Sequence, residues 1–340
     1  MSKTKAVFIV NDIPDFIKGD MLNYVYGQER VAQIRELCDL HPQRITSENL
    51  DQELPSLKDV EVIFSCWGMI PLTAQQLDFM PKLKAVFYAS GSVNAFAEPF
   101  VERGITVCSS ISANAVPVAE FCLAEILLSC KGAYRNSAAC RQGPWHPDDI
   151  ANGRGVYGAT IALLGIGAVS RHLLKLLKPF NLRVIALHDY LSLEQSRALG
   201  IDELVDLETA FREAYVVSNH LPNKSQTTGL MTEAHFRSMP KGATFINTGR
   251  GAQVDEAGLL AALRARPDLT ALLDVQHPEP PAAGSPLYNQ PNIHLTSHIA
   301  GSLNDEVGRM PDYMIAEFQR WQAGEPLLYQ VDPASLAARA

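Results

Sequence analysis

Three side chains between residues 247 and 301 have types and sequence contexts that suit a proton-transfer site. Arg250 lies in the segment NTGRG, Glu279 in DVQHPEP and His298 in SHIAG. An arginine can bind a carboxylate through two parallel charge-assisted hydrogen bonds. A histidine is the usual general acid or base, and a carboxylate bonded to its other ring nitrogen fixes the tautomer and favours the imidazolium form. This combination suits the reduction of a 2-oxo acid, provided that a hydride donor binds beside it.

Each of the three residues follows an apolar segment that is expected to form a strand. These segments are residues 243–247 before Arg250, 269–273 before Glu279 and 293–295 before His298. Taken singly, the arginine and the glutamate could be surface residues, and the histidine a core residue. Together they favour one site, because ligands of open α/β sheets bind at the carboxyl ends of the strands.

A glycine-rich segment upstream offers a place for the hydride donor. The apolar strand candidate 160–164 runs directly into Gly165 and Gly167, and a helical pattern follows from Ala168 and Val169. The first glycine permits a tight turn, and the second lets a pyrophosphate approach the backbone and the amide end of the helix. The strand, turn and helix are the context that dinucleotide binding requires, although a tight packing turn would look similar.

Asp189 ends the next strand candidate, 19 residues beyond Ser170. An acidic side chain at this position can accept hydrogen bonds from both ribose hydroxyls and repels a 2′-phosphate. We therefore expect NAD as the cofactor, with NADP disfavoured.

The chain alternates short apolar runs with helical patterns, which is typical of a parallel α/β protein. Its 340 residues are too many for one ordinary core and fit two domains. Several runs are apolar throughout, as in strands that are covered on both faces. A long helix is expected over residues 116–139, with Asn114 and Pro117 near its start.

Composition argues against several classes of protein. The net charge of −8 and the absence of a basic run disfavour binding to nucleic acid or to an anionic membrane. No apolar stretch is expected to approach the roughly 20 residues that a membrane-spanning helix needs, and the run at residues 6–10 is too short for a signal peptide. The six cysteines show no metal-binding spacing, so we expect reduced thiols, no metal site and a cytoplasmic location.

Beyond these features, the chain resembles the D-isomer-specific 2-hydroxyacid dehydrogenases, a family that includes glyoxylate/hydroxypyruvate reductases and D-lactate and D-phosphoglycerate dehydrogenases. The similarity extends over most of the chain, and NTGRG and HIAG are its specific segments. The matching segments are SGSV (90–93), NAVPVAE (114–120), GPW (143–145), GATIALLGIG (158–167), HLP (220–222), NTGRGAQVDE (247–256), LDV (273–275), EP (279–280) and HIAG (298–301).

The resemblance implies an α/β architecture of two Rossmann-like or flavodoxin-like domains with parallel sheets. An NAD-binding domain over residues 113–305 would be inserted into a discontinuous substrate domain over 1–112 and 306–340. Homodimers would form through the cofactor domains.

The resemblance also implies roles for single residues. Arg250 would bind the substrate, Glu279 would support His298, and His298 would transfer the proton. Asp274 would hold the nicotinamide carboxamide. Other implied contacts are His220, Pro222, Thr248 and Gly301 for the cofactor, and the backbone of Gly91, Ser92 and Val93 for the substrate carboxylate.

Four residues depart from the usual pattern of the family. Gln276 stands at a position that is usually aromatic, and Ser170 at one that is usually glycine. Ser92 and Asn94 replace the more usual glycine and aspartate in the loop after a strand. We expect the chemistry to be unaffected and the substrate pocket to differ.

The loop that carries Trp67 and Met69 is expected to face the substrate, and it has no basic residue nearby. Relatives that act on phosphorylated acids tend to place an arginine near this loop. Binding a phosphate dianion without a cationic partner would cost free energy of desolvation. An uncharged substrate side chain, small or apolar, is therefore favoured over phosphoglycerate. It is equally consistent that both side chains belong to the core.

Three other functions can be weighed against a 2-hydroxyacid dehydrogenase. Formate dehydrogenases of this superfamily carry glutamine beside the histidine, so Glu279 speaks against formate. Phosphite dehydrogenases keep the same arginine, glutamate and histidine, so that activity stays open. An NAD-responsive binding protein that resembles the C-terminal-binding corepressors is the alternative from another class, although no counterpart of their extended tails is expected here.

Overall fold

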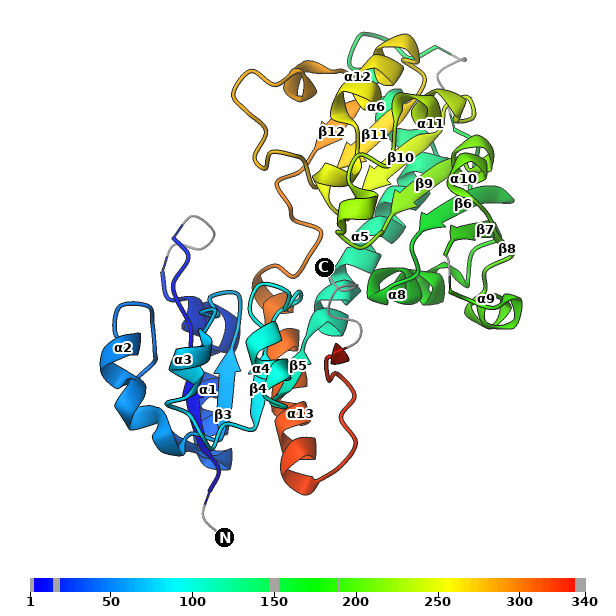
Figure 1. The fold of residues 1–340 in the computed structure, drawn as a ribbon. Coiled ribbons are helices and arrows are strands. Elements are labelled where there is room, and N and C mark those ends of the chain that lie inside the picture. The colour runs from blue at the N-terminus through cyan, green and yellow to red at the C-terminus, as the bar shows by residue number, and fades with distance from the viewer. Residues whose placement is uncertain (1–2, 15–18, 147–152, 189, 334–340) are drawn as a thin grey trace. The chain divides into compact units, whose positions relative to one another are not determined.

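The computed structural model describes residues 3–14, 19–146, 153–188 and 190–333. The chain divides into two compact units (Figure 1). One unit combines Met1–Asn114 with Ser302–Ala340, and the other is Ala115–Gly301. The first unit is thus built from two chain segments that the second separates in sequence.

The first unit contains a five-stranded, all-parallel sheet in the order β2-β1-β3-β4-β5. Its strands are β1 (Lys5–Phe8), β2 (Asp39–Leu40), β3 (Val62–Ser65), β4 (Ala85–Tyr88) and β5 (Thr106–Ser109). This is the strand order of flavodoxin-like folds.

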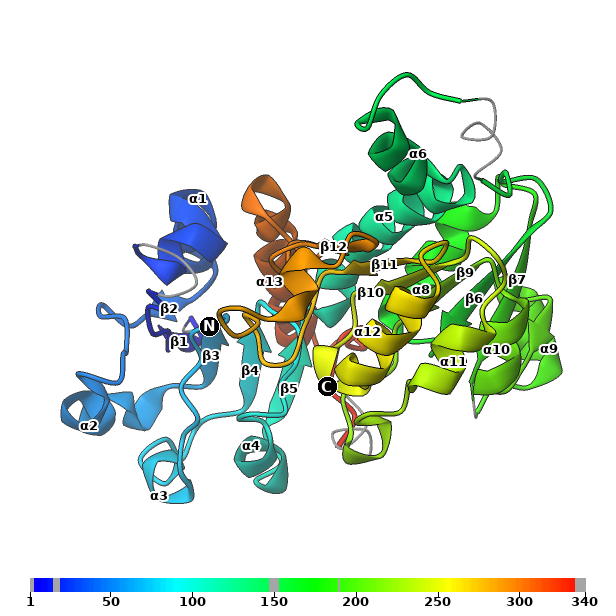
Figure 2. The ribbon, with the colours of Figure 1, turned by 90° about the horizontal axis from the view of Figure 1, so that it is seen from above.

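Helices cover both faces of this sheet (Figure 2). One face carries α1 (Met21–Leu37), η5 (Asn304–Gly308) and α13 (Arg309–Ala323); the other carries α2 (Leu50–Glu53), η1 (Leu54–Asp59), α3 (Ala74–Leu77) and α4 (Glu98–Glu102). The late helix α13 belongs here because the ring of Phe318 packs at 5.2 Å from Phe64 and 5.6 Å from Phe87, on two neighbouring strands.

The second unit contains a seven-stranded, all-parallel sheet in the order β12-β11-β10-β9-β6-β7-β8. Its strands are β6 (Ala159–Leu164), β7 (Leu182–Leu187), β8 (Glu203–Leu204), β9 (Val216–Asn219), β10 (Thr244–Asn247), β11 (Thr270–Leu273) and β12 (Ile293–Leu295). The first six in sequence repeat the Rossmann order 3-2-1-4-5-6, and β12 extends it by one strand. The predicted class of two parallel α/β domains is confirmed.

The α-helices of this unit are α5 (Ile111–Cys130), which begins in the last residues before Ala115, α6 (Ala133–Cys140), α8 (Ala168–Leu177), α9 (Leu193–Leu199), α10 (Leu207–Glu213), α11 (Glu233–Ser238) and α12 (Glu256–Ala265). Its short 3-10 turns are η2 (Ser225–Thr227), η3 (Gly251–Gln253) and η4 (Pro286–Asn289). Figure 2 shows α10, α11 and α12 along one side of the strands and α5 along the other. In α8, Ser170, Leu173, Leu174 and Leu177 recur at helical spacing and are all buried, which fixes the face that packs on the sheet.

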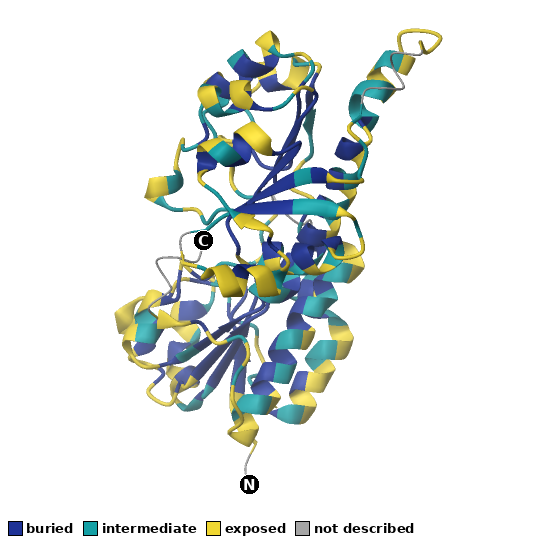
Figure 3. Cartoon of the chain, turned by 90° about the vertical axis from the view of Figure 1, so that its right-hand side faces the viewer, coloured by how far each residue is buried: buried dark blue, intermediate teal, exposed yellow. Residues whose placement is uncertain are grey.

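The central strands of both sheets are largely buried, as Figure 3 shows by the dark strands within each unit. Every residue of β3, β4, β9, β10 and β11 is buried. This agrees with the expectation from their uninterrupted apolar sequences that both faces are covered.

The single long helix predicted over residues 116–139 is wrong in extent. The structure has two helices, because Gly132 adopts a left-handed conformation (φ 66°) that separates α5 from α6. The first begins at Ile111, so Pro117 lies inside the helix rather than at its start.

The expectation that no apolar stretch reaches spanning length is also wrong. Helix α5 has 20 residues with a mean hydropathy of 1.6, long and apolar enough to meet that criterion. Its residues Val118, Ala119, Cys122, Ile126 and Cys130 belong to the core of the second unit. A core helix of a globular domain meets the same criterion.

All six cysteines are free thiols, and only Cys140 is exposed. Burial raises the pKa of Cys66 to about 12 and that of Cys122 to about 11, so both stay protonated at neutral pH. Within the described residues, no three His, Cys, Asp or Glu side chains are grouped so that they could hold a metal ion.

Candidate active site

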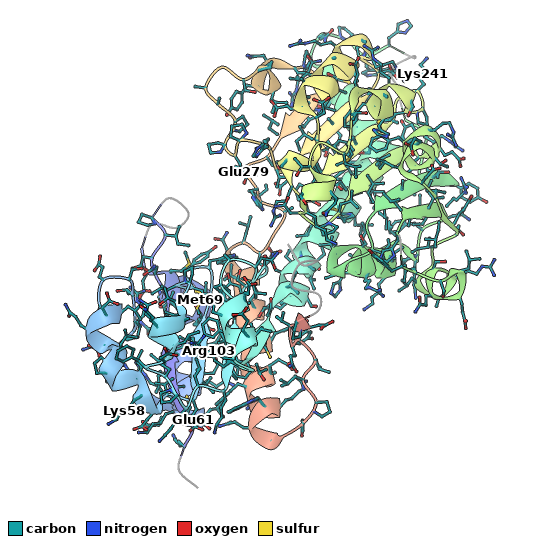
Figure 4. The ribbon with its side chains drawn as sticks, in the orientation of Figure 1. Lys58, Glu61, Met69, Arg103, Lys241 and Glu279 are labelled. Carbon is teal, nitrogen blue, oxygen red and sulfur yellow. The ribbon has the colours of Figure 1, made fainter. Side chains whose placement is uncertain are left out.

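Arg250, Glu279 and His298 follow three adjacent strands of the second unit. Strand β10 pairs with β11, and β11 pairs with β12, all in parallel. Arg250 lies three residues beyond β10, and His298 three residues beyond β12. Figure 4 labels Glu279 on the loop that follows β11. Because the strands are parallel, all three residues lie in loops at the carboxyl edge of one sheet.

The imidazole of His298 is paired with Glu279. Its Nδ1 lies 2.6 Å from Oε1 of the glutamate, a distance typical of a charge-assisted hydrogen bond. Both side chains are partly exposed, at 48% for the histidine and 38% for the glutamate. The bond fixes the proton on Nδ1 and leaves Nε2 as the nitrogen that can exchange a proton with a ligand.

The backbone of His298 is strained, with a φ of 59° that non-glycine residues rarely adopt. Such a conformation costs about 1–3 kcal/mol and persists only where the surrounding structure holds it. Here the N–H of His298 donates to the carbonyl oxygen of Asp274 at 3.0 Å. The next two amides, of Ile299 and Ala300, donate to the carboxylate of Asp274 at 2.8 and 3.0 Å.

Asp274 is therefore the anchor of the loop that carries His298. Its side chain is buried, and Oδ1 also accepts a hydrogen bond from the Thr296 hydroxyl at 2.6 Å. Three of the roughly four acceptor positions of the carboxylate are thus taken within the protein. The contact with the nicotinamide carboxamide that the sequence led us to expect stays a prediction.

The guanidinium of Arg250 is exposed, and its Nη1 donates to the carbonyl oxygen of Gly249 at 2.7 Å. Within the described residues, no hydrogen bond or ion pair joins it to Glu279 or His298. Its charge is therefore left to pair with an anionic ligand.

A network of buried amides holds the Arg250 loop in place. The Asn219 amide donates to Asn247 Oδ1 at 2.9 Å and to Gln253 Oε1 at 2.7 Å. Gln253 in turn donates to the carbonyl oxygens of Leu221 and Pro222 at 3.0 and 2.9 Å. All three amide side chains are buried. We did not predict this network from the sequence. The feature of the sequence that could have indicated it is a set of uncharged amide side chains at or beyond the ends of apolar strands.

The glycine turn lies where the strand order of the Rossmann sheet reverses. Strand β6 pairs with β7 on one side and with β9 on the other. Gly165 follows β6 with a φ of 87°, and a Cβ there would lie 2.8 Å from the carbonyl oxygen of His220, just after β9. Only glycine fits this turn, which places the β6 and β9 loops together at the crevice where nucleotides bind in such folds.

The residues after this turn fit a dinucleotide pyrophosphate. Gly167 caps α8 without a side-chain hydrogen bond, and a Cβ there would meet no atom within 4 Å. The first amides of α8, at Ala168 and Val169, have no acceptor within the helix and suit an anion. Ser170, at the usual third glycine, is buried and donates to the carbonyl oxygen of Gly165 at 2.6 Å. Serine is thus accommodated and ties the turn together.

The other predicted cofactor residues occupy loops at the same edge. His220 Nε2 lies 2.9 Å from Ser218 Oγ, and burial lowers the histidine pKa to about 4, so the ring is neutral at pH 7. Thr248 Oγ1 contacts Cys122 Sγ at 3.4 Å. Pro222 follows β9, and Gly301 ends the unit after β12. Asp189, on which the choice of NAD over NADP depends, lies outside the described residues.

The predicted substrate residues of the first unit lie after two adjacent parallel strands, β3 and β4. Trp67 is half-buried against the core, and its ring centre is 6.5 Å from that of Tyr24. Val93 is buried, and the carbonyl oxygen of Gly91 accepts a hydrogen bond from Ser109 at 2.5 Å. Ser92 is half-buried. Trp67 therefore contributes to the core of its own unit, whichever further role it has.

Most of the second unit matches a known protein family. Residues 123–300 match the family model of the D-isomer specific 2-hydroxyacid dehydrogenase, NAD binding domain. This match covers more than half of the chain, and the protein belongs to that family. The matched residues fall within the second unit, which holds both the glycine turn and the pair of His298 and Glu279.

Individual relatives are distant. The chain is 28% identical to a D-3-phosphoglycerate dehydrogenase of Archaeoglobus fulgidus over 77% of this chain and 49% of that protein, so it spans about half of that relative's length. It is 28% identical to a glyoxylate reductase of Korarchaeum cryptofilum over 81% of this chain and 86% of that protein. A phosphoglycerate oxidoreductase structure from Rhizobium etli superposes with a TM-score of 0.80 at 23% identity, covering 97% and 99% of the two chains, which supports the fold.

Proposed function

We propose that the protein is an NAD-dependent oxidoreductase that interconverts a 2-oxo acid and a D-2-hydroxy acid. The observation that carries this proposal is the 2.6 Å pairing of His298 with Glu279 at the sheet edge that also presents the glycine turn. A proton donor and a dinucleotide site are the two parts that carbonyl reduction needs. Membership of the family supports the same reaction class.

In the direction of reduction, the exposed guanidinium of Arg250 binds the substrate carboxylate and polarises the adjacent carbonyl. His298 donates its Nε2 proton to the carbonyl oxygen, and the oxygen becomes the hydroxyl of the product. The imidazolium that precedes this transfer is stabilised by the carboxylate of Glu279. NADH, when bound, supplies the hydride that adds to the carbonyl carbon. In the reverse direction, neutral His298 accepts the hydroxyl proton.

The residues that would hold the cofactor are those of the glycine turn. The amides of Gly167, Ala168 and Val169 would receive the pyrophosphate, since the helix start is open. Asp189 would select NAD over NADP through the ribose hydroxyls. We assign the cofactor-domain role to residues 113–305 and propose homodimers through this domain.

The substrate is proposed to carry an uncharged side chain, small or apolar. The loop around Trp67 and Met69 has no basic residue, and both side chains pack against apolar cores. A phosphorylated substrate would place a dianion beside a loop that carries no cation of its own.

A panel assay tests the proposal. NADH oxidation is measured with glyoxylate, hydroxypyruvate, pyruvate, and branched and aromatic 2-oxo acids, with NADPH as the cofactor control. We expect turnover with at least one of these acids and a D-2-hydroxy acid as the product. Proven NADH binding without turnover of any acid would contradict the proposal. Phosphite with NAD is included, because phosphite oxidation uses the same three residues; turnover of phosphite alone would favour that activity instead.

A further inference from the structure

Gln276 occupies a central position among the three catalytic loops. It is a buried polar residue in the loop after β11, and 8% of the residue is exposed. A buried amide is retained at low cost only where its hydrogen bonds are made, so its partners indicate what it holds together.

The first partner segment carries His298. The side-chain nitrogen of Gln276 donates to the carbonyl oxygen of Thr296 at 3.3 Å and to that of Leu273 at 2.8 Å. Thr296 lies two residues before His298, and Leu273 ends β11. The one amide therefore connects the β11 strand end to the start of the histidine loop.

The second and third partner segments carry Glu279 and Arg250. The backbone N–H of Gln276 points to Oε2 of Glu279, with nitrogen and oxygen 3.4 Å apart. The Gly251 Cα packs against the Gln276 backbone, since a Cβ there would lie 2.0 Å from the Gln276 carbonyl carbon. Gly251 directly follows Arg250, so the arginine loop abuts the same peptide.

We infer that Gln276 is a positioning residue. It holds the loops that carry Arg250, Glu279 and His298 in fixed positions relative to one another. It touches no reacting atom itself and acts through the loop on which His298 is held. Two donor protons on one amide are needed, because both acceptors are backbone carbonyl oxygens. An apolar side chain could fill the same space but could not bridge them. The inference rests on the proposed function, because one of its tests measures turnover. The other test measures the hydrogen bond between His298 and Glu279 and needs no turnover.

The test compares Gln276→Met, which keeps length and volume but removes the donors, with the wild-type protein. Gln290→Met is the matched control, since this half-buried glutamine of the same unit donates to Asn292 and to none of the three loops. We expect kcat to fall roughly 10- to 100-fold in Gln276→Met, the scale of a misplacement of about 1 Å, with the KM for NADH unchanged. Gln290→Met is expected to keep the wild-type kcat.

A second readout does not need turnover. The His298 Nδ1–H proton, assigned by its loss in His298→Ala, is expected as a downfield NMR resonance in the wild type and as a broadened or shifted one in Gln276→Met. Gln276→Asn, which keeps the amide but shortens its reach, is the milder variant and is expected to change in the same direction. Wild-type kcat and an unchanged resonance in the folded Gln276 variants would overturn the inference. Failure of the wild type to reduce any 2-oxo acid would instead count against the proposed function and leave the NMR comparison decisive for Gln276.

Discussion

His298 and Glu279 lie in loops after two neighbouring strands, 19 residues apart in sequence, and their side chains meet at 2.6 Å. The contact depends on two sets of hydrogen bonds at this edge of the sheet. Asp274 holds the histidine backbone at its positive φ, and Gln276 connects the strand end to the histidine loop. The imidazole of His298 is thus oriented by contacts within the protein.

Replacing Glu279 by glutamine tests the charge in this pair. The glutamine can still accept a hydrogen bond from Nδ1, but it no longer stabilises the imidazolium form of His298. We expect kcat for reduction to fall roughly 10- to 100-fold, because the neutral amide no longer supports the proton transfer by His298. Glu194→Gln, a substitution of the same kind at an exposed position of α9, is expected to keep the wild-type kcat. A wild-type kcat in Glu279→Gln would rule out this role.

Replacing Asp274 by asparagine tests the anchor of the histidine loop. The new NH2 group cannot accept from an amide, so at least one of the bonds to Ile299 and Ala300 is lost. We expect the free energy of unfolding to fall by about 2–3 kcal/mol and kcat to fall with it. Denaturant titration and steady-state kinetics measure the two effects. A variant with unchanged stability and kcat would show that the strained loop needs no such anchor.

Replacing Gly165 by alanine tests the crevice between β6 and β9. Two costs are expected, one from the positive φ and one from the approach to the His220 carbonyl oxygen. Gly200→Ala is the matched control, because Gly200 has a φ of 85° but no atom within 4 Å of a Cβ. We expect both variants to lose about 1–2 kcal/mol of stability from the backbone strain. Weaker NADH binding, measured by calorimetry, is expected in Gly165→Ala alone; equal NADH affinity in the two variants would contradict the assignment of this turn.

The burial of His220 makes stability depend on pH. Its pKa is lowered to about 4 by desolvation, against about 6.5 in the unfolded chain, so between these values the unfolded state binds more protons. The contribution of the neutral His220 ring to the free energy of unfolding is fully present above pH 6.5 and is lost as the pH falls towards 4. We expect the drop in unfolding free energy from pH 7 to pH 5 to be about 1–2 kcal/mol smaller in His220→Gln than in wild type. Parallel pH dependences of the two proteins would contradict this burial effect.

The sequence predicts those features of the candidate site that depend on strand ends. Arg250, Glu279 and His298 were expected at one edge because each follows an apolar run, and the parallel order β10-β11-β12 places them there. The turn at Gly165 was expected for the same reason. These predictions needed only the local pattern and the rule that parallel strands share an edge.

Other features could not be predicted because they depend on contacts between distant residues. Gln253 bonds to Asn219, Leu221 and Pro222, each more than 30 residues away in sequence, and no local pattern reveals these contacts. The anchoring of Ile299 by Asp274 bridges 25 residues. The break at Gly132 was missed because one glycine within an apolar helical pattern is often tolerated. The strands β2 and β8, of two residues each, are too short to show an alternating pattern.

Hydride transfer from deuterium-labelled NADH, followed in wild type and in His298→Ala, tests the central claim most directly. With a 2-oxo acid that the panel identifies, we expect the wild type to yield a D-2-hydroxy acid that carries deuterium on C2. His298→Ala is expected to form the same product with kcat lower by roughly 10²–10⁴-fold, the scale of a lost general acid. A wild-type rate in His298→Ala, or a wild-type protein that binds NADH and places no deuterium on C2 of any acid, would contradict the account.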